Sequence, residues 1–261
     1  MQPEVRRRWG RRLPRRSLAE FGLVTVAFLL YFLVRGAVVD RADEALSNAR
    51  DLVALEQQLG FYWEPAWQAP VLRHELLIRL ANLVYFWFHF PLICVVGLWL
   101  YHQQRIHYTL TRNALLISGA VGLVIYNLYP VAPPRYLPEL GLVDTMAVYS
   151  RVNYEMQETR WFVNPYAAVP SLHFGWNLLL GIGVFLATRN LWWRIFAVIM
   201  PAGMFWAIVV TGNHFIIDAV IGGAVCLAGL AAAAALHRWS PPALRFAGGV
   251  LVAEAEAPPS R

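Results

Sequence analysis

Residues 215–236 read FIIDAVIGGAVCLAGLAAAAAL, and this stretch decides the fold class. It carries one charged residue, Asp218, in a run long enough to cross the hydrocarbon core of a bilayer, which takes about 20 residues of helix. A second run of this kind, FGLVTVAFLLYFLVRGAVV, occupies residues 21–39. Both runs predict transmembrane helices, so we expect an all-α membrane protein.

Apolar windows elsewhere extend this prediction to a six-transmembrane-helix bundle. The second window contains Asn82, His89 and Pro91, which predicts a kink there. Residues 42–60 combine helical apolar spacing with many charges, which is typical of an amphipathic helix lying on the membrane interface. The six windows are 18–39, 80–101, 113–130, 172–188, 194–211 and 215–236.

The composition agrees with a membrane protein and excludes several other classes. Hydrophobic residues make up 58% of the chain and charged residues 15%, whereas soluble domains carry about a quarter charged residues. Disordered chains are polar and highly charged, so disorder is excluded as well. The two cysteines, Cys94 and Cys226, lie in apolar runs and predict neither a disulfide framework nor a zinc site.

All 22 basic residues are arginine, and their distribution predicts the orientation of the chain. If the amino terminus is cytoplasmic, the inner segments hold 14 arginines and three acids, whereas the outer segments hold seven arginines and 11 acids. The net charge of +6 therefore indicates a membrane and not a nucleic-acid partner. We expect a basic cytoplasmic tail at 1–17, an uncleaved six-span domain at 18–236 and a flexible cytoplasmic tail at 237–261, in the plasma (inner) membrane.

Three polar clusters interrupt the apolar pattern where spans begin or end. They are YPVAPPRY at 129–136, AVPSLH at 168–173 and GNHFIID at 212–218. The orientation inferred from the arginines places all three at the extracytoplasmic face. Ionisable groups at membrane depth are costly and mark functional sites, so this agreement predicts an active site there.

The residues in these clusters suit phosphoryl transfer. His214 and Asp218 are four apart on one helix face, so the carboxylate can orient the imidazole as a nucleophile. His173 is the candidate acid for the departing oxygen. We expect Arg135, the Ser171 hydroxyl and the backbone N–H groups after Pro170, starting with Leu172, to bind the phosphate oxygens. This mechanism predicts no metal and no cofactor, because His214 supplies the nucleophile.

At these residues the chain resembles the type 2 phosphatidic acid phosphatase superfamily. Pro170-Ser171-Leu172-His173 and His214-x-x-x-Asp218 are similar to its second and third motifs. The fuller pattern, with Tyr-Pro-Val-Ala-Pro-Pro-Arg, Asn164-Pro165-Tyr166 and Gly222-Gly223, is similar to the inositol phosphorylceramide synthase-like (inositolphosphotransferase) branch over about residues 75–236.

The resemblance implies a six-helix fold and a metal-independent phosphohistidine mechanism on lipid-linked phosphates. It makes His214 the nucleophile, Asp218 its partner and His173 the acid and base. Tyr136, Asn164 and Asn213 are candidates for the pocket wall. The chain departs from the superfamily at two phosphate-binding cations, since Leu128 replaces a lysine and Ala207-Ile208 replace Ser-Arg.

Several alternatives stay open from the sequence. Hydrolysis by water makes the protein a lipid-phosphate phosphatase, which we favour, and attack by an alcohol acceptor such as inositol makes it a phosphotransferase. A transporter or scaffold with the same fold is a third interpretation. A zinc site formed by His173, His214 and Asp218 and a purely structural His214–Asp218 pair are weaker ones.

Overall fold

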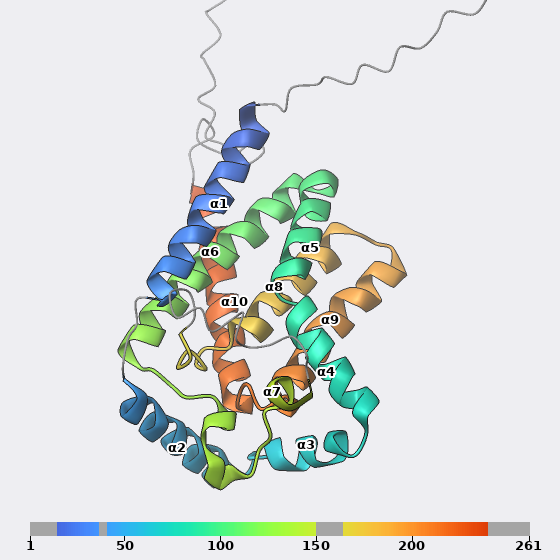
Figure 1. Ribbon diagram of the computed structural model, residues 1–261. Coiled ribbons are helices and arrows are strands. Elements are labelled where there is room, and N and C mark those ends of the chain that lie inside the picture. The colour runs from blue at the N-terminus through green and yellow to red at the C-terminus, as the bar shows by residue number, and fades with distance from the viewer. Residues whose placement is uncertain (1–14, 37–40, 150–163, 240–261) are drawn as a thin grey trace, which may run out of the picture.

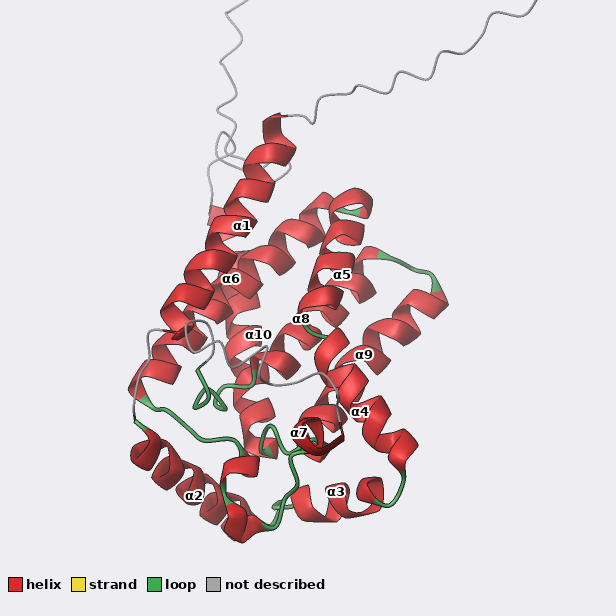
Figure 2. Cartoon of the chain, viewed as in Figure 1, coloured by secondary structure: helices red, strands yellow, loops and turns green. Residues whose placement is uncertain are grey.

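The computed structural model describes residues 15–36, 41–149 and 164–239. Residues 1–14 and 240–261, which hold most of the two predicted tails, lie outside the described residues. Within the described part all regular secondary structure is helical, apart from one isolated β-bridge between Val131 and Ala167 (Figure 2). The helices are α1 (Arg15–Gly36), α2 (Ala42–Leu59), α3 (Glu64–Leu72), α4 (Glu75–Trp87), α5 (Phe90–Gln103), α6 (Arg105–Leu128), η1 (Pro134–Tyr136), η2 (Pro138–Leu140), α7 (Thr145–Tyr149), α8 (Leu172–Ala187), α9 (Leu191–Val210) and α10 (Ile216–Trp239).

Four of these helices, α1, α6, α9 and α10, are long and apolar enough to cross a membrane. Helices α4 and α5 together form a fifth candidate, and α8, with 16 residues, is apolar but shorter than the others. The prediction of an α-helical membrane protein is therefore confirmed. The prediction of six spans is supported for four or five helices by length and composition.

The second predicted span is broken, as its proline and polar residues indicated. Helices α4 and α5 meet at an angle of 54° across Phe88 and His89. Pro91 lies in the first turn of α5, where its missing N–H leaves no hydrogen bond unmade. The predicted kink is therefore confirmed, and it presents His89 at the bend.

Two helices, α2 and α3, lie across the end of the bundle at which α10 begins (Figure 1). One is α2, predicted from its amphipathic spacing, which ends at Gly60 in the left-handed conformation, φ 77°. The other is α3, which the apolar windows did not predict. Both lie at the opposite end of the molecule from Arg15, where α1 begins.

Helix α8 lies at the centre of the bundle and packs on α5, α6, α9 and α10. Glycines make these close approaches possible, as small residues do between membrane helices. A Cβ atom on Gly175 would lie 2.6 Å from the Gly222 carbonyl oxygen of α10, and one on Gly181 would lie 2.4 Å from the Ala197 carbonyl oxygen of α9. The backbone of α8 is thus fixed by its neighbours, and the residues at its start are held in place.

Candidate active site

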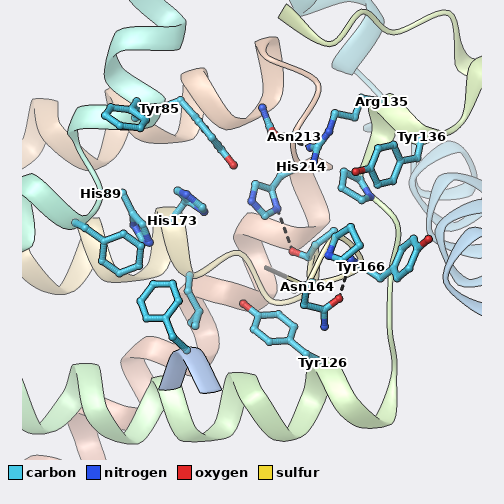
Figure 3. Close-up of a pocket in the computed structure, with 18 of the residues that line it drawn as sticks. Tyr85, His89, Tyr126, Arg135, Tyr136, Asn164, Tyr166, His173, Asn213 and His214 are labelled. Carbon is cyan, nitrogen blue, oxygen red and sulfur yellow. Dashed lines mark hydrogen bonds between the residues drawn. The ribbon is translucent and has the colours of Figure 1, made fainter. Parts of the chain in front are cut away.

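A pocket of about 900 Å³ lies at the start of α8 and α10 (Figure 3). Its wall combines segments that are far apart in the sequence: α1, the α4–α5 bend, the end of α6, the loop after it, and the residues before α8 and α10. The wall is rich in aromatic side chains and also carries polar and charged groups. It includes His173, His214, Arg135, Asn213, Asn164, Tyr85, His89, Tyr126, Tyr136 and Tyr166.

His214 is fixed in the pocket through one nitrogen of its ring. Nδ1 lies 3.0 Å from the carbonyl oxygen of Ala168 and 3.2 Å from Oδ2 of Asp218. Both partners are acceptors, so Nδ1 carries the hydrogen and the lone pair resides on Nε2. Asp218, which is fully buried, also accepts the backbone N–H of Phe215 at 2.9 Å and is thereby held in this orientation.

His173 faces His214 from the first turn of α8. The centroids of the two rings are 5.6 Å apart, and the planes are inclined by 54°. An acid must lie within about 2.6–3.2 Å of the atom that it protonates, so rings at this separation can contact one phosphoryl group from two sides. The structure therefore brings together the two histidines that the sequence placed on separate helices.

Arg135 reaches the same pocket from the turn η1. Its guanidinium donates to Oδ1 of Asn213, forms an ion pair with Asp144 at 3.3 Å and lies 4.8 Å from the ring centroid of Tyr136. Its backbone N–H donates to the carbonyl oxygen of Gly212 at 3.1 Å. These contacts hold a positive charge beside His214, which is where a phosphate oxygen would need it.

The two predicted phosphate ligands at the start of α8 are placed differently. Leu172 lines the pocket, whereas Ser171 is fully buried and does not contribute to the wall. The Ser171 backbone N–H donates to the carbonyl oxygen of Asp218 at 2.9 Å, which joins the start of α8 to the first turn of α10. The Ser171 hydroxyl thus lies behind the pocket wall in this structure.

The three residues predicted for the wall, Asn164, Asn213 and Tyr136, all line the pocket. Oδ1 of Asn164 accepts the backbone N–H of Tyr166 at 2.9 Å, while its Nδ2 is buried without a hydrogen-bond partner in the described part of the chain. Asn213 donates from Nδ2 to the Thr211 hydroxyl at 2.8 Å. These amides add neutral hydrogen-bonding groups beside the charged ones.

Sequence reasoning missed the group of aromatic rings that supports His173. His89 stacks on His173 with centroids 3.9 Å apart, and Tyr85 stacks on His173 with centroids 4.6 Å apart. Tyr126 lines the pocket and donates its hydroxyl to the carbonyl oxygen of Pro170 at 2.8 Å. The signal available in the sequence was a histidine and a tyrosine beside Pro91, where the backbone bends.

The residues that replace the two phosphate-binding cations of the superfamily, Leu128 and Ala207-Ile208, do not line the pocket. Leu128 points outward and is 73% exposed, whereas Ala207 and Ile208 are fully buried in the bundle. Among the described residues that line the pocket, Arg135 is the one arginine, and the chain has no lysine. The positive charge for an anionic substrate is therefore concentrated on Arg135 and on the histidines when they are protonated.

No group of three or more His, Cys, Asp or Glu side chains is arranged to hold a metal ion in the part of the chain that the structure describes. Asp218 contacts the same ring nitrogen of His214 that the Ala168 carbonyl contacts, so this carboxylate orients the ring. The arrangement of a fixed imidazole, a second imidazole and an arginine is one that can bind a phosphate and transfer it.

Comparison with known proteins identifies the family to which the chain belongs. A family model of the PAP2 superfamily matches residues 50–234, which is more than two thirds of the chain. The match begins earlier than the resemblance over 75–236 and takes in α3 and most of α2. No curated protein and no solved structure matches. The inositol phosphorylceramide synthase-like branch is not distinguished by this match. Members of the superfamily are generally phosphatases or phosphotransferases, and the chain belongs to the PAP2 superfamily.

Proposed function

We propose that the protein is an integral membrane lipid-phosphate phosphatase that acts through a phosphohistidine on His214. One observation carries the proposal: Nδ1 of His214 is held by Ala168 and Asp218 while its ring faces His173 across the pocket. Superfamily membership supports a lipid phosphatase or phosphotransferase. The aromatic wall of the pocket suits a lipid substrate, and Arg135 suits its phosphate.

The proposed reaction has two steps. In the first, the lone pair on Nε2 of His214 attacks phosphorus, the bond from phosphorus to the lipid oxygen breaks, and His173 in its protonated form gives that oxygen a proton. In the second, His173 takes a proton from water, the water oxygen attacks phosphorus, and the phosphorus–nitrogen bond breaks. Asp218 stabilises the positive charge that develops on the His214 ring, and Arg135 stabilises the negative charge on the phosphoryl oxygens.

A phosphotransferase is the second candidate, and the polar side of the pocket favours it. Asn164, Asn213 and Tyr166 offer more hydrogen-bonding groups than an attacking water needs. An alcohol such as inositol would then replace water in the second step, and a phospho-alcohol group would move between lipid and acceptor. This reading matches the inositolphosphotransferase-like pattern of the sequence.

The orientation that we propose places the pocket on the extracytoplasmic side of the plasma (inner) membrane. Helix α8 is then the fourth of six spans, the interfacial helix α2 lies outside, and both termini are cytoplasmic. The arginine distribution supports this arrangement. The pocket residues come from the end of α6 and from the starts of α8 and α10, which in alternating spans face the same side.

The test is turnover of a labelled lipid phosphate by the purified protein, with and without inositol or another alcohol. Release of free phosphate indicates hydrolysis, and a new labelled lipid indicates transfer. His214→Ala should abolish either product, while His102→Ala, at the far end of α5, is the matched control. Turnover that survives in the His214 variant would contradict the proposal. The absence of turnover in the parent would favour a transporter or scaffold, and inhibition by EDTA would favour a metal site.

A further inference from the structure

Two buried glutamates from outside the pocket contact the start of α10. Glu64 of α3 accepts the backbone N–H of Ile216 through Oε1 at 2.8 Å, and Glu56 of α2 accepts that of Ile217 through Oε1 at 2.8 Å. The first N–H groups of a helix have no acceptor within the helix. Both side chains are fully buried. Helices α2 and α3, which are far from α10 in the sequence, thus supply the acceptors that the first turn of α10 lacks.

The second oxygen atom of each of these two carboxyl groups has no such hydrogen-bond donor among the described residues. Oε2 of Glu56 and Oε2 of Glu64 are buried, and no donor from another described residue reaches them. The two carboxyl groups are close together, because they accept hydrogen bonds from the N–H groups of two consecutive residues, Ile216 and Ile217. Two ionised carboxylates so placed would repel and would both be desolvated, whereas one shared proton satisfies both oxygens.

The electrostatics of the pair agree with a shared proton. Burial and the neighbouring Glu64 raise the pKa of Glu56 to about 9, and burial raises the pKa of Glu64 as well. Among the described residues, Tyr62 and Asp218 are the other titratable groups that interact electrostatically with the pair. Burial and the two glutamates raise the pKa of Tyr62 to about 12, so its phenol stays neutral where the pair titrates.

The pair is connected directly to the candidate nucleophile. His214 precedes three residues whose backbone N–H groups are each held by a different carboxyl group: Phe215 by Asp218, Ile216 by Glu64 and Ile217 by Glu56. Asp218 is also the partner of Nδ1 of His214. A displacement of this turn would therefore move the His214 ring relative to His173.

We propose that Glu56 and Glu64 form a one-proton carboxyl pair that positions His214, so that the interfacial helices α2 and α3 set the geometry of the active site. The inference rests on the proposed role of His214. It makes the two glutamates positioning residues, because neither lines the pocket or contacts the substrate.

Glutamine substitutions test the pair, since an amide keeps the shape of the side chain. In Glu56→Gln or Glu64→Gln the amide oxygen can accept the backbone N–H and the amide nitrogen can donate to the remaining carboxylate. In the double variant two amide NH₂ groups face each other, and the contact is lost. We expect each single variant to lower kcat by less than about threefold and the double variant to lower it by about tenfold or more, with little change in KM.

The pH profile separates a shared proton from simple helix capping. Loss of the proton from His173, the proposed acid, should lower kcat in the parent and in the variants alike. In the parent, kcat should fall further as pH rises past about 9, where the pair loses its proton, and the single variants should not show this second fall because an amide does not titrate. Glu75→Gln, which changes an exposed glutamate paired with Arg79, is the matched control. A double variant with a kcat no lower than that of the more impaired single variant, or single variants that keep the parent's second fall past about pH 9, would overturn the inference.

A readout without turnover keeps this test separate from the proposed function. The proton is bound in the folded state up to about pH 9 and in the unfolded chain only up to about pH 4.5. The unfolding temperature of the parent in detergent should therefore decrease as the pH is raised from about 4.5 to about 9. The single variants should show a smaller fall. If the parent turns over no lipid phosphate, the proposed function fails while this comparison still decides whether the pair exists. If the double variant does not fold, the two single variants decide it.

Discussion

Arg135 is the residue on which binding of an anionic substrate depends most in this structure. Its guanidinium is shared between Asn213, which offers a neutral oxygen, and Asp144, which is a competing anion at 3.3 Å. Asp144 is 22% exposed, so water screens part of this attraction. The arginine is therefore held in position without being fully neutralised, and an incoming phosphate must compete with one carboxylate.

Because Asp144 competes with the substrate for Arg135, substitutions of Arg135 and of Asp144 should change KM in opposite directions. Arg135→Ala should raise KM for a lipid phosphate by about tenfold or more, because a charge-assisted contact is lost. Asp144→Asn should lower KM by about twofold to fivefold, since the competing charge is removed while the side-chain shape stays. Steady-state kinetics measure both. Arg50→Ala, which breaks an exposed pair with Glu139, is the control and should leave KM unchanged.

The two histidines show how far single residues could be predicted from the sequence. The His214–Asp218 contact is local, and its spacing of four residues led the sequence to predict it. The predicted shared helix face is wrong, because α10 begins at Ile216 and His214 lies two residues before it. The approach of His173 to His214 required the orientation of the spans, which the arginines supplied. The stacking of His89 and Tyr85 on His173 depends on the angle of a bend, and nothing in a pattern of apolar residues gives an angle.

At the level of elements, the contact between α8 and α10 depends on the absence of a side chain. A Cβ atom on Gly222 would lie 2.2 Å from the carbonyl oxygen of Ser171 and 3.0 Å from its backbone nitrogen. Backbone atoms cannot rotate away as a flexible side chain does, so the two helices would have to separate. His173 follows Ser171 by two residues and would move with it.

Gly222→Ala should therefore impair both folding and turnover. Forcing an extra carbon into a packed contact costs about 1–3 kcal/mol, so the unfolding temperature in detergent should fall, and kcat should fall with it. Gly97→Ala is the matched control, because a Cβ atom there meets nothing within 4 Å and α5 gains a better helix former. Equal unfolding temperatures and equal kcat values for the two variants would contradict the close approach of α8 and α10.

Helix α1 is attached to the bundle through a buried ion pair. Glu20 accepts hydrogen bonds from Arg112 and, at 2.8 Å, from the hydroxyl of Tyr108, both on α6. The Glu20 and Arg112 side chains are 4% and 6% exposed. The rest of α1 presents mainly apolar side chains on the outside, as a lipid-facing helix does.

Removing one member of this pair should loosen α1. Arg112→Met leaves a buried carboxylate without its cation, which costs about 3–5 kcal/mol. The combination of Glu20→Leu with Arg112→Met removes both charges and should recover most of that loss. Thermal unfolding in detergent measures the two variants, and a double variant as unstable as the single one would contradict this role of the pair.

The sequence predicted long elements better than short ones for a physical reason. Apolar runs identify spans because lipid demands them, and Pro91 correctly predicted the break between α4 and α5. Helix α3 has nine residues with prolines at 65 and 70, so no apolar run or periodicity marks it. Its contribution lies in Glu64, a charged residue whose burial follows from tertiary packing and not from local sequence.

At the scale of the whole molecule, the arginine count predicts which end of the bundle faces the cytoplasm. Alkaline phosphatase is active only when it is exported, so a fusion after residue 150 should be active and a fusion after residue 107 inactive. The reverse pattern would show that the pocket faces the cytoplasm. Normal expression of both fusions, checked with an antibody, is the control.

The brevity of α8 has a consequence for the lipid environment. Sixteen residues rise about 24 Å, about 6 Å less than the thickness of a typical hydrocarbon core. In the six-span arrangement that we propose, with the far end of α8 at one surface, its first turn would lie below the level of the glycerol backbones. Either the leaflet dimples there or the substrate sinks toward the acyl chains, and both become easier as the bilayer thins. Membranes of short-chain lipids should thus support faster turnover than thick ones.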